Sequence, residues 1–191
     1  MRTFIAVDFP KEVVNKINEI ITYFKAQVPD SALKWVPAEN LHLTVRFIGE
    51  INSEQLAIIS PLLIEAMRDV SSFKIGIEGL GMYPKPVNPR VIWLGINDGF
   101  PLKTIHQNLN HVLKVINVQP EAREFSPHLT IARLKRQTDP EVVKQIGKIL
   151  SQYKVGFLGH VLVNHLTLYQ STLTPSGPDY KALLTLNLNQ V

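Results

Sequence analysis

A long internal repeat limits what this chain can fold into, because both of its halves must form the same elements. In the first half, the apolar run 4–7 precedes a Phe-Pro pair and apolar residues at helical spacing up to Phe24. In the second half, the run 91–94 precedes another Phe-Pro pair and a similar pattern up to Ile116. Apolar runs of this length are typical of strands, and proline suits the first turn of a helix. Each half is therefore predicted to begin with a strand and a helix.

A His-Leu-Thr sequence follows each helical pattern, within strand-like runs at 41–45 and 127–131. The offset from the start of the first strand to the histidine is 38 residues in one half and 37 in the other. The histidines, His42 and His128, therefore occupy equal positions in two copies of one pattern. The remaining predicted elements are helices at 53–67 and 140–153, the second capped by Asp139, and closing strands at 73–80 and 161–169.

These elements predict an α+β fold built from two βαβαβ-like halves, approximately residues 1–82 and 90–171. The proline-rich stretch 83–89 is the predicted link between them. We expect one bilobal domain over residues 1–191, in which strands of the two halves could interleave.

Composition excludes several classes of protein. The 191 residues are 45% hydrophobic and 19% charged, which is enough apolar material for a large core without disulfides, and the chain has no cysteine. Zinc or thiol chemistry based on cysteine is therefore excluded. Asp8 interrupts the short apolar stretch near the start, so we expect no secretory signal and a cytoplasmic protein. The longest uncharged stretch, 155–178, contains glycines and histidines and predicts sheet rather than a membrane span.

The two His-Leu-Thr strands bring together the residues that acid-base chemistry needs. Residues two apart share a face of a strand, so His42 and Thr44 point one way, as do His128 and Thr130. A pair of imidazoles, each with a pKa of about 6.5, can hold one neutral base and one protonated acid. Phosphodiester cleavage uses such a pair, with hydroxyls donating to the phosphoryl oxygens, and requires no metal. Arg133 could add a charged contact to phosphate if a bulge turned it to the same face.

The other candidate polar residues have simpler interpretations. Alternation places Arg46 on the face of His42, although a solvated arginine is an equal alternative. His165 begins a third His-Leu-Thr that has no counterpart in the first half, so we predict that it belongs to a polar strand face. His106 and His111 fall off the apolar stripe of their helix, and His160 follows a glycine. All three are predicted to be surface residues.

Longer stretches of the sequence resemble a known family. LHLTVRFIGE and SPHLTIARL resemble the paired motif of the two-histidine phosphoesterases. FIAVDFP, RVIWLG, GLGMYP, LYQSTL and GPDY are similar to the RNA 2',3'-cyclic phosphodiesterases, historically also called 2'-5' RNA ligases. The resemblance covers nearly the whole chain. It implies two antiparallel sheets, related by a pseudo-twofold axis, that line a central cleft with the helices outside.

The resemblance also implies roles for individual residues. His42 matches the family's proton donor to the leaving oxygen, and His128 its proton acceptor that activates water. Thr44, Thr130 and Arg133 match the contacts to phosphate. It further implies that no metal or cofactor takes part, that the product is a 2'-phosphomonoester, and that joining of tRNA halves through 2'-5' bonds is a secondary activity.

The cleft must also hold a nucleotide, and aromatic side chains commonly stack on RNA bases. Tyr83, Trp35 and Tyr169 are the candidates, although each could instead fill the core. The expected partners are RNA ends with a 2',3'-cyclic phosphate, with no membrane partner and a monomer as the default. Two alternative functions remain open: a non-catalytic RNA-binding module on the same fold, and a histidine-based metal enzyme, which the lack of nearby acidic residues disfavours.

Overall fold

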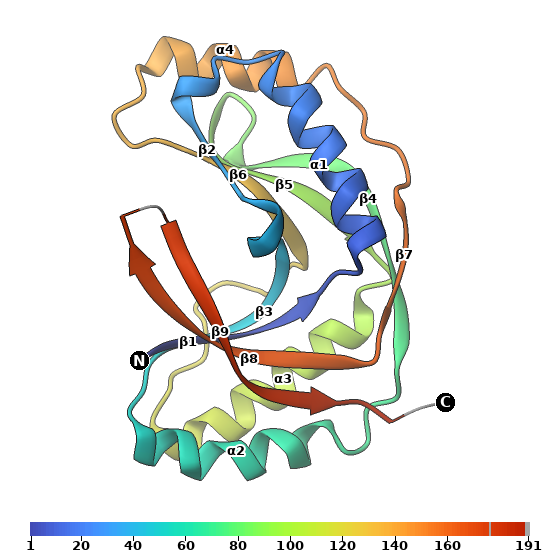
Figure 1. Cartoon of the computed structure of the whole chain (residues 1–191), viewed down its shortest axis with the longest axis vertical. Coiled ribbons are helices and arrows are strands. Elements are labelled where there is room, and N and C mark those ends of the chain that lie inside the picture. Colours follow the sequence, from blue (N-terminus) through green and yellow to red (C-terminus); the bar gives the residue numbers. More distant parts are fainter. Residues whose placement is uncertain (176, 190–191) are drawn as a thin grey trace.

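Figure 1 shows the computed structural model, which describes residues 1–175 and 177–189. In this part of the chain, nine strands form two antiparallel sheets. The strands are β1 (Arg2–Asp8), β2 (Leu33–Trp35), β3 (His42–Glu50), β4 (Phe73–Lys85), β5 (Asn88–Asn97), β6 (His128–Leu134), β7 (Gly159–Val163), β8 (His165–Thr174) and β9 (Gly177–Asn187). The helices are α1 (Lys11–Lys25), α2 (Ser53–Met67), α3 (Phe100–Leu113) and α4 (Pro140–Leu150), with short 3-10 turns η1 (Asp30–Ala32), η2 (Ala38–Asn40) and η3 (Lys114–Ile116).

Each sheet contains strands from both halves of the sequence. The four-stranded sheet has the order β3-β1-β8-β9, and the five-stranded sheet has the order β2-β6-β5-β4-β7. In Figure 1 the two sheets face each other, α2 and α3 cover the outer side of the four-stranded sheet, and α1 and α4 lie against the other sheet. The predicted α+β architecture, with sheets inside and helices outside, is therefore confirmed.

Two details of the predicted element order were wrong. The closing strand 161–169 is in fact β7 and β8, which belong to different sheets. The buried positions change phase at the break, from Val161 and Val163 to Leu166 and Leu168, so the period of two does not continue through it. The break is at Asn164, whose carbonyl accepts a hydrogen bond from the Leu188 amide.

The stretch 83–89 is not a link between lobes. β4 runs to Lys85 and β5 starts at Asn88, so these residues form the tip of a hairpin within one sheet. The short strand β2 and the last strand β9 have no counterpart among the predicted elements.

The helices form where amphipathic sequence meets a favourable N-terminus. α1 buries Val13, Ile17, Ile21 and Phe24, which lie on one side at a spacing of three or four residues. As predicted, the Asp139 side chain caps α4 by accepting a hydrogen bond from the Glu141 amide.

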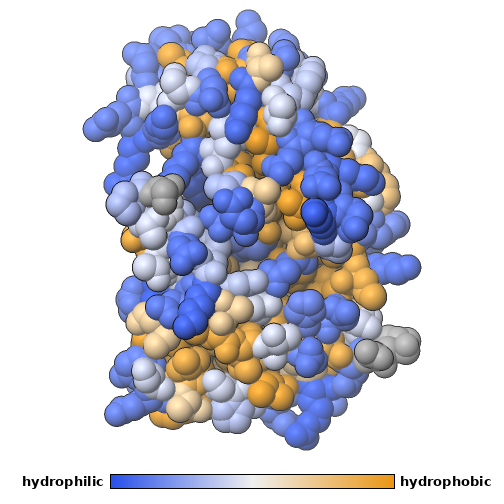
Figure 2. All heavy atoms as spheres, in the orientation of Figure 1, coloured by the Kyte–Doolittle hydropathy of each residue, from blue (hydrophilic) through white to orange (hydrophobic). Residues whose placement is uncertain are grey.

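The surface in this orientation is largely hydrophilic around α1 and α4, with more hydrophobic side chains over the lower part of the molecule (Figure 2). None of the helices in the ranges 1–175 and 177–189 is long and apolar enough to cross a membrane.

Candidate active site

A β-bulge in each of two strands decides which side chains face the space between the sheets. Opposite β1, Ile5 pairs with Arg46 and Ala6 with Thr44, so Val45 is an extra residue in β3. Opposite β5, Ile92 pairs with Ala132 and Trp93 with Thr130, so β6 has an extra residue at the same place. An extra residue reverses the alternation beyond it.

The bulge in β6 places Arg133 on the same face as the two motif residues before it. His128, Thr130 and Arg133 all line one cavity of about 1070 Å³, together with His42 and Thr44 from β3. The residues predicted to act on phosphate are thus brought together around one opening. The β-bulge required for Arg133 to face the cavity is therefore present in β6.

The same bulge in β3 makes the prediction for Arg46 wrong. Arg46 neither shares the face of His42 nor is solvated, because its side chain turns to the helix side of the sheet and is only 2% exposed. Phe47 takes the position in β3 that Arg133 has in β6, and Ala132 takes that of Arg46.

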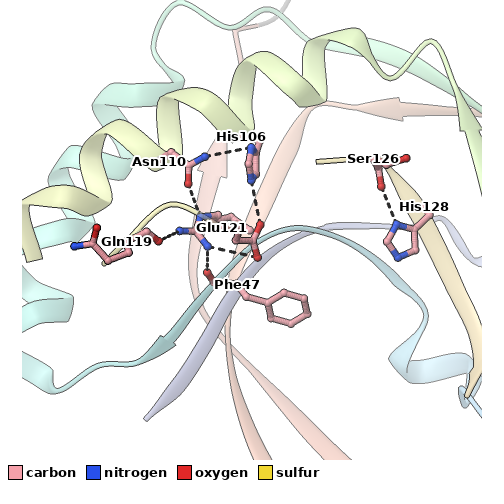
Figure 3. A network of polar contacts seen from close by, with 8 residues as sticks. Phe47, His106, Asn110, Gln119, Glu121, Ser126 and His128 are labelled. Atoms are coloured by element: carbon pink, nitrogen blue, oxygen red, sulfur yellow. Dashed lines mark hydrogen bonds and ion pairs between the residues drawn. The ribbon is translucent and has the colours of Figure 1, made fainter. Parts of the chain in front are cut away.

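Backbone carbonyls orient both histidines. Nδ1 of His42 lies 2.7 Å from the Asn40 carbonyl, and Nδ1 of His128 lies 2.7 Å from the Ser126 carbonyl, as Figure 3 shows for the second pair. A carbonyl can only accept, so each Nδ1 carries a hydrogen. The remaining ring nitrogen, Nε2, is therefore the one that gains or loses a proton. In His42 it lies 3.0 Å from the Thr44 hydroxyl oxygen.

Burial dominates the electrostatic surroundings of His42. Burial of the ring lowers the pKa of His42, while the hydrogen bond to Asn40 and the charge of Asp8 raise it and the charge of Arg133 lowers it. Burial is the largest of these effects, so in the empty cleft His42 is pushed toward its neutral form.

A tyrosine packs against each histidine ring. Tyr83 lies edge-on to His128 at 5.2 Å between ring centroids, and Tyr180 lies edge-on to His42 at the same distance. Both tyrosines line the cavity. Tyr83 was predicted, but Tyr180 was missed. The only signal for it was its place in the GPDY stretch of the family resemblance.

The other two stacking candidates are not part of the cavity wall among the described residues. Trp35 donates its ring hydrogen to Asp30 Oδ1 at 2.5 Å. Tyr169 donates its hydroxyl to Asp8 Oδ1 at 2.7 Å and stacks on Phe4. Burial, and then the hydrogen bond to Asp8, raise the pKa of Tyr169 to about 12. A role of these two side chains in base stacking stays a prediction, and in the structure their contacts are to Asp30, Asp8 and Phe4.

The remaining histidines divide into surface residues and one buried residue. His165 is absent from the described cavity wall and has Asn164 and Asp8 as neighbours, while His111 and His160 are exposed. The prediction for His106 was wrong: it is only 7% exposed, because a segment that precedes β6 covers it. Within the described residues, no group of three His, Asp or Glu side chains could hold a metal ion.

Comparison with known proteins identifies the family. The model of LigT-like phosphoesterases matches the chain twice, at residues 7–93 and 94–180. The chain belongs to the LigT-like phosphoesterases. The two matches follow one another along the sequence, as expected for a duplicated LigT-like unit.

Several relatives of the chain are named RNA 2',3'-cyclic phosphodiesterase. The RNA 2',3'-cyclic phosphodiesterase of Archaeoglobus fulgidus is 36% identical over 96% of this chain and 98% of its own length. That of Thermotoga maritima is 34% identical over 96% of this chain and 93% of its own.

Solved structures of LigT from Escherichia coli share the fold. The unliganded crystal structure has a TM-score of 0.76 and 26% identity, covering 99% of this chain and 98% of that one. The complex with 3'-AMP has a TM-score of 0.77 at the same identity and coverage. A complex with phosphate matches with a TM-score of 0.73.

Proposed function

We propose that this protein hydrolyses the 2',3'-cyclic phosphate at RNA ends to a 2'-phosphomonoester, using His42 as acid and His128 as base. One observation carries the proposal. Two imidazoles with Nδ1 bound to backbone carbonyls belong to a single cavity that also contains Thr44, Thr130 and Arg133. The names of the relatives and the 3'-AMP complex of E. coli LigT support the substrate class.

The reaction follows from the free ring nitrogens. Neutral His128 accepts a proton at Nε2 from a water molecule, whose oxygen forms a new bond to phosphorus. The bond from phosphorus to O3' breaks, and O3' takes the proton from Nε2 of His42. Hydroxyl groups of the two threonines and the guanidinium of Arg133 stabilise the negative charge on the non-bridging oxygens. The phosphate stays on O2', and the next cycle needs only the return of one proton from His128 to His42 through solvent.

The acid must be protonated when the substrate is bound, although burial favours neutral His42 in the empty cleft. A bound phosphodiester adds a negative charge beside the ring, and an opposite charge raises the pKa of an imidazole. Substrate binding therefore produces the charged state of His42 that the reaction uses.

This electrostatic arrangement predicts two different pH profiles. Both kcat and kcat/KM should be bell-shaped, falling at low pH as the base is protonated and at high pH as the acid loses its proton. The alkaline limb of kcat/KM reports free His42, whose pKa is lowered, whereas that of kcat reports His42 beside phosphate. We therefore expect the alkaline limb of kcat to lie at higher pH. Initial rates between pH 5 and 9 measure both, and flat profiles with chemistry rate-limiting would contradict the mechanism.

The activity itself is tested with a short RNA that ends in a 2',3'-cyclic phosphate, incubated with purified protein in excess EDTA. We expect complete conversion to the 2'-phosphomonoester, at the rate measured without chelator, because every group in the mechanism comes from the chain. Binding of this RNA without hydrolysis would favour the non-catalytic module. Loss of turnover in EDTA that added Mg²⁺ or Mn²⁺ restores would favour a metal enzyme.

A ribose 5'-hydroxyl in place of the attacking water would convert the same cyclic phosphate into a 2'-5' bond. We propose such joining of RNA ends, with tRNA halves as one substrate, as a secondary activity. High concentrations of ends with free 5'-hydroxyls would favour it by mass action.

A further inference from the structure

The segment 119–127, which precedes β6, forms one wall of the cavity and contains no helix or strand. Glu121, Phe125 and Ser126 are among the residues that line the cavity. Throughout residues 1–175 and 177–189, the backbone hydrogen bonds made outside helices and strands involve none of these nine positions. The wall must therefore be held by side chains.

Lys103 contacts Glu124 and Tyr83 contacts Ser126, each at 3.5 Å, but the most extensive contacts come from two side chains on the helix side of the four-stranded sheet. Arg46 donates from Nη2 to the Gln119 carbonyl at 2.6 Å, and its Nη1 lies 3.5 Å from Glu121 Oε1. His106 on α3 contacts Glu121 Oε2 at 3.1 Å and stacks on Phe125, with ring centroids 4.6 Å apart and an angle of 10° between the planes. Figure 3 shows His106 reaching Glu121, with Ser126 and His128 to one side of them.

Arg46 is fixed on its other sides as well. Its Nε donates to Asn110 Oδ1 at 2.7 Å, and its Nη1 donates to the Phe47 carbonyl at 2.5 Å. Burial lowers the pKa of Arg46, and the charge of Glu121 opposes that effect. A buried guanidinium is stable only when such partners satisfy it, so this network has little freedom to rearrange.

The other half of the molecule supports its histidine differently. The carbonyl that orients His42 belongs to Asn40, in the 3-10 turn η2. Backbone bonds fix that turn, since the amides of Asn40 and Leu41 donate to the carbonyls of Pro37 and Ala38. The carbonyl that orients His128 belongs to Ser126, which follows Phe125 in the segment held by side chains.

We propose that Arg46 is a positioning residue for His128: it holds segment 119–127 and thereby the Ser126 carbonyl that keeps a proton on Nδ1 of His128. The effect of Arg46 on the rate of hydrolysis rests on the proposed function. Its effects on the order of the segment and on the tautomer of His128 do not. Without this carbonyl in place, the neutral ring can carry its proton on Nε2, and it then cannot accept one from water.

The first test uses protein without substrate and the variant Arg46→Met, which keeps much of the side-chain length and removes every donor. Nitrogen relaxation of the backbone amides at 119 and 121–126 should show order parameters that fall from about 0.85, typical of rigid backbone, to below about 0.6, typical of flexible backbone. Nitrogen NMR of labelled histidine should show neutral His128 changing from one tautomer to a mixture, with His42 unchanged. Unaltered order parameters and an unaltered tautomer would overturn the proposal.

The second test is kinetic and has a matched control. Arg46→Met should lower kcat on a 2',3'-cyclic nucleotide by about tenfold or more while changing KM less, because proton transfer and not binding is impaired. Leu63→Ala is a buried change on α2 in the same helix layer, and it removes none of the polar and ring contacts described for the segment. The two variants are compared under conditions in which their free energies of unfolding are equal. If Leu63→Ala then lowers kcat as much as Arg46→Met does, Arg46 acts only through stability and the proposal fails.

Two further variants complete the design. Arg46→Lys keeps the charge but not the fork of donors, so its order parameters and kcat should lie between those of wild type and Arg46→Met. If Arg46→Met does not fold, Glu121→Ala, at a partly exposed residue, removes one of the same anchors and is expected to loosen the segment in the same assay. A wild-type protein without hydrolytic activity would reject the proposed function, while the order parameters and the tautomer would still decide on Arg46.

Discussion

Replacement of either His42 or His128 by alanine is expected to lower kcat on a 2',3'-cyclic nucleotide by at least about 10²-fold. Each ring supplies a proton transfer that the other cannot supply, because both Nδ1 atoms are engaged with carbonyls and each Nε2 acts on a different oxygen. Single-turnover rates at the pH optimum measure the loss of the chemical step directly.

The control for both variants is His165→Ala. His165 begins the third His-Leu-Thr sequence and lies in the same sheet as His42, but it is not among the described residues that line the cavity. Its replacement should leave kcat within about twofold of wild type. A near-normal rate for His42→Ala or His128→Ala, in protein with a normal circular dichroism spectrum, would refute the acid-base pair.

Thr44→Val and Thr130→Val should each lower kcat by roughly 10²-fold, with a smaller change in KM. Valine keeps the volume of threonine and removes only the hydroxyl, so the change tests the donation of a hydrogen bond to the phosphoryl oxygen. Thr44 has an additional contact with Nε2 of His42, so its loss should also shift the alkaline limb of the pH profile.

Thermal unfolding of both valine variants, followed by fluorescence, provides the control for a loss of stability. Strand residues tolerate valine well, so we expect little change in Tm. Unchanged kinetics in both variants would mean that the threonines serve the strands and do not contact phosphate.

Periodicity was sufficient to predict the main helices and the paired strands that contain the histidines. The segment 53–67 was predicted with the bounds of α2, and both His-Leu-Thr runs lie in strands as expected. These elements are predictable because their apolar spacing reports directly which side is buried.

Features that depend on pairing between strands were harder to predict. Alternation gave the wrong face for Arg46 because a bulge at Val45 depends on the register with β1, which one strand does not encode by itself. The burial of His106 and the place of Tyr180 depend on segments that fold over them from elsewhere in the chain. The local sequence pattern around a residue does not show which distant segment will pack over it.

The order of strands in the four-stranded sheet has a consequence for how this protein is made. β1 lies between β3 and β8, and the hydrogen bond from Tyr169 to Asp8 joins residues 161 positions apart. A ribosome would therefore release the first strand long before its second neighbour is synthesised. During that time β1 can pair only with β3 and has one open edge, which is the kind of edge that other chains can join. Closure of this sheet, and with it the cleft, is a late and non-local step, and such steps are slow.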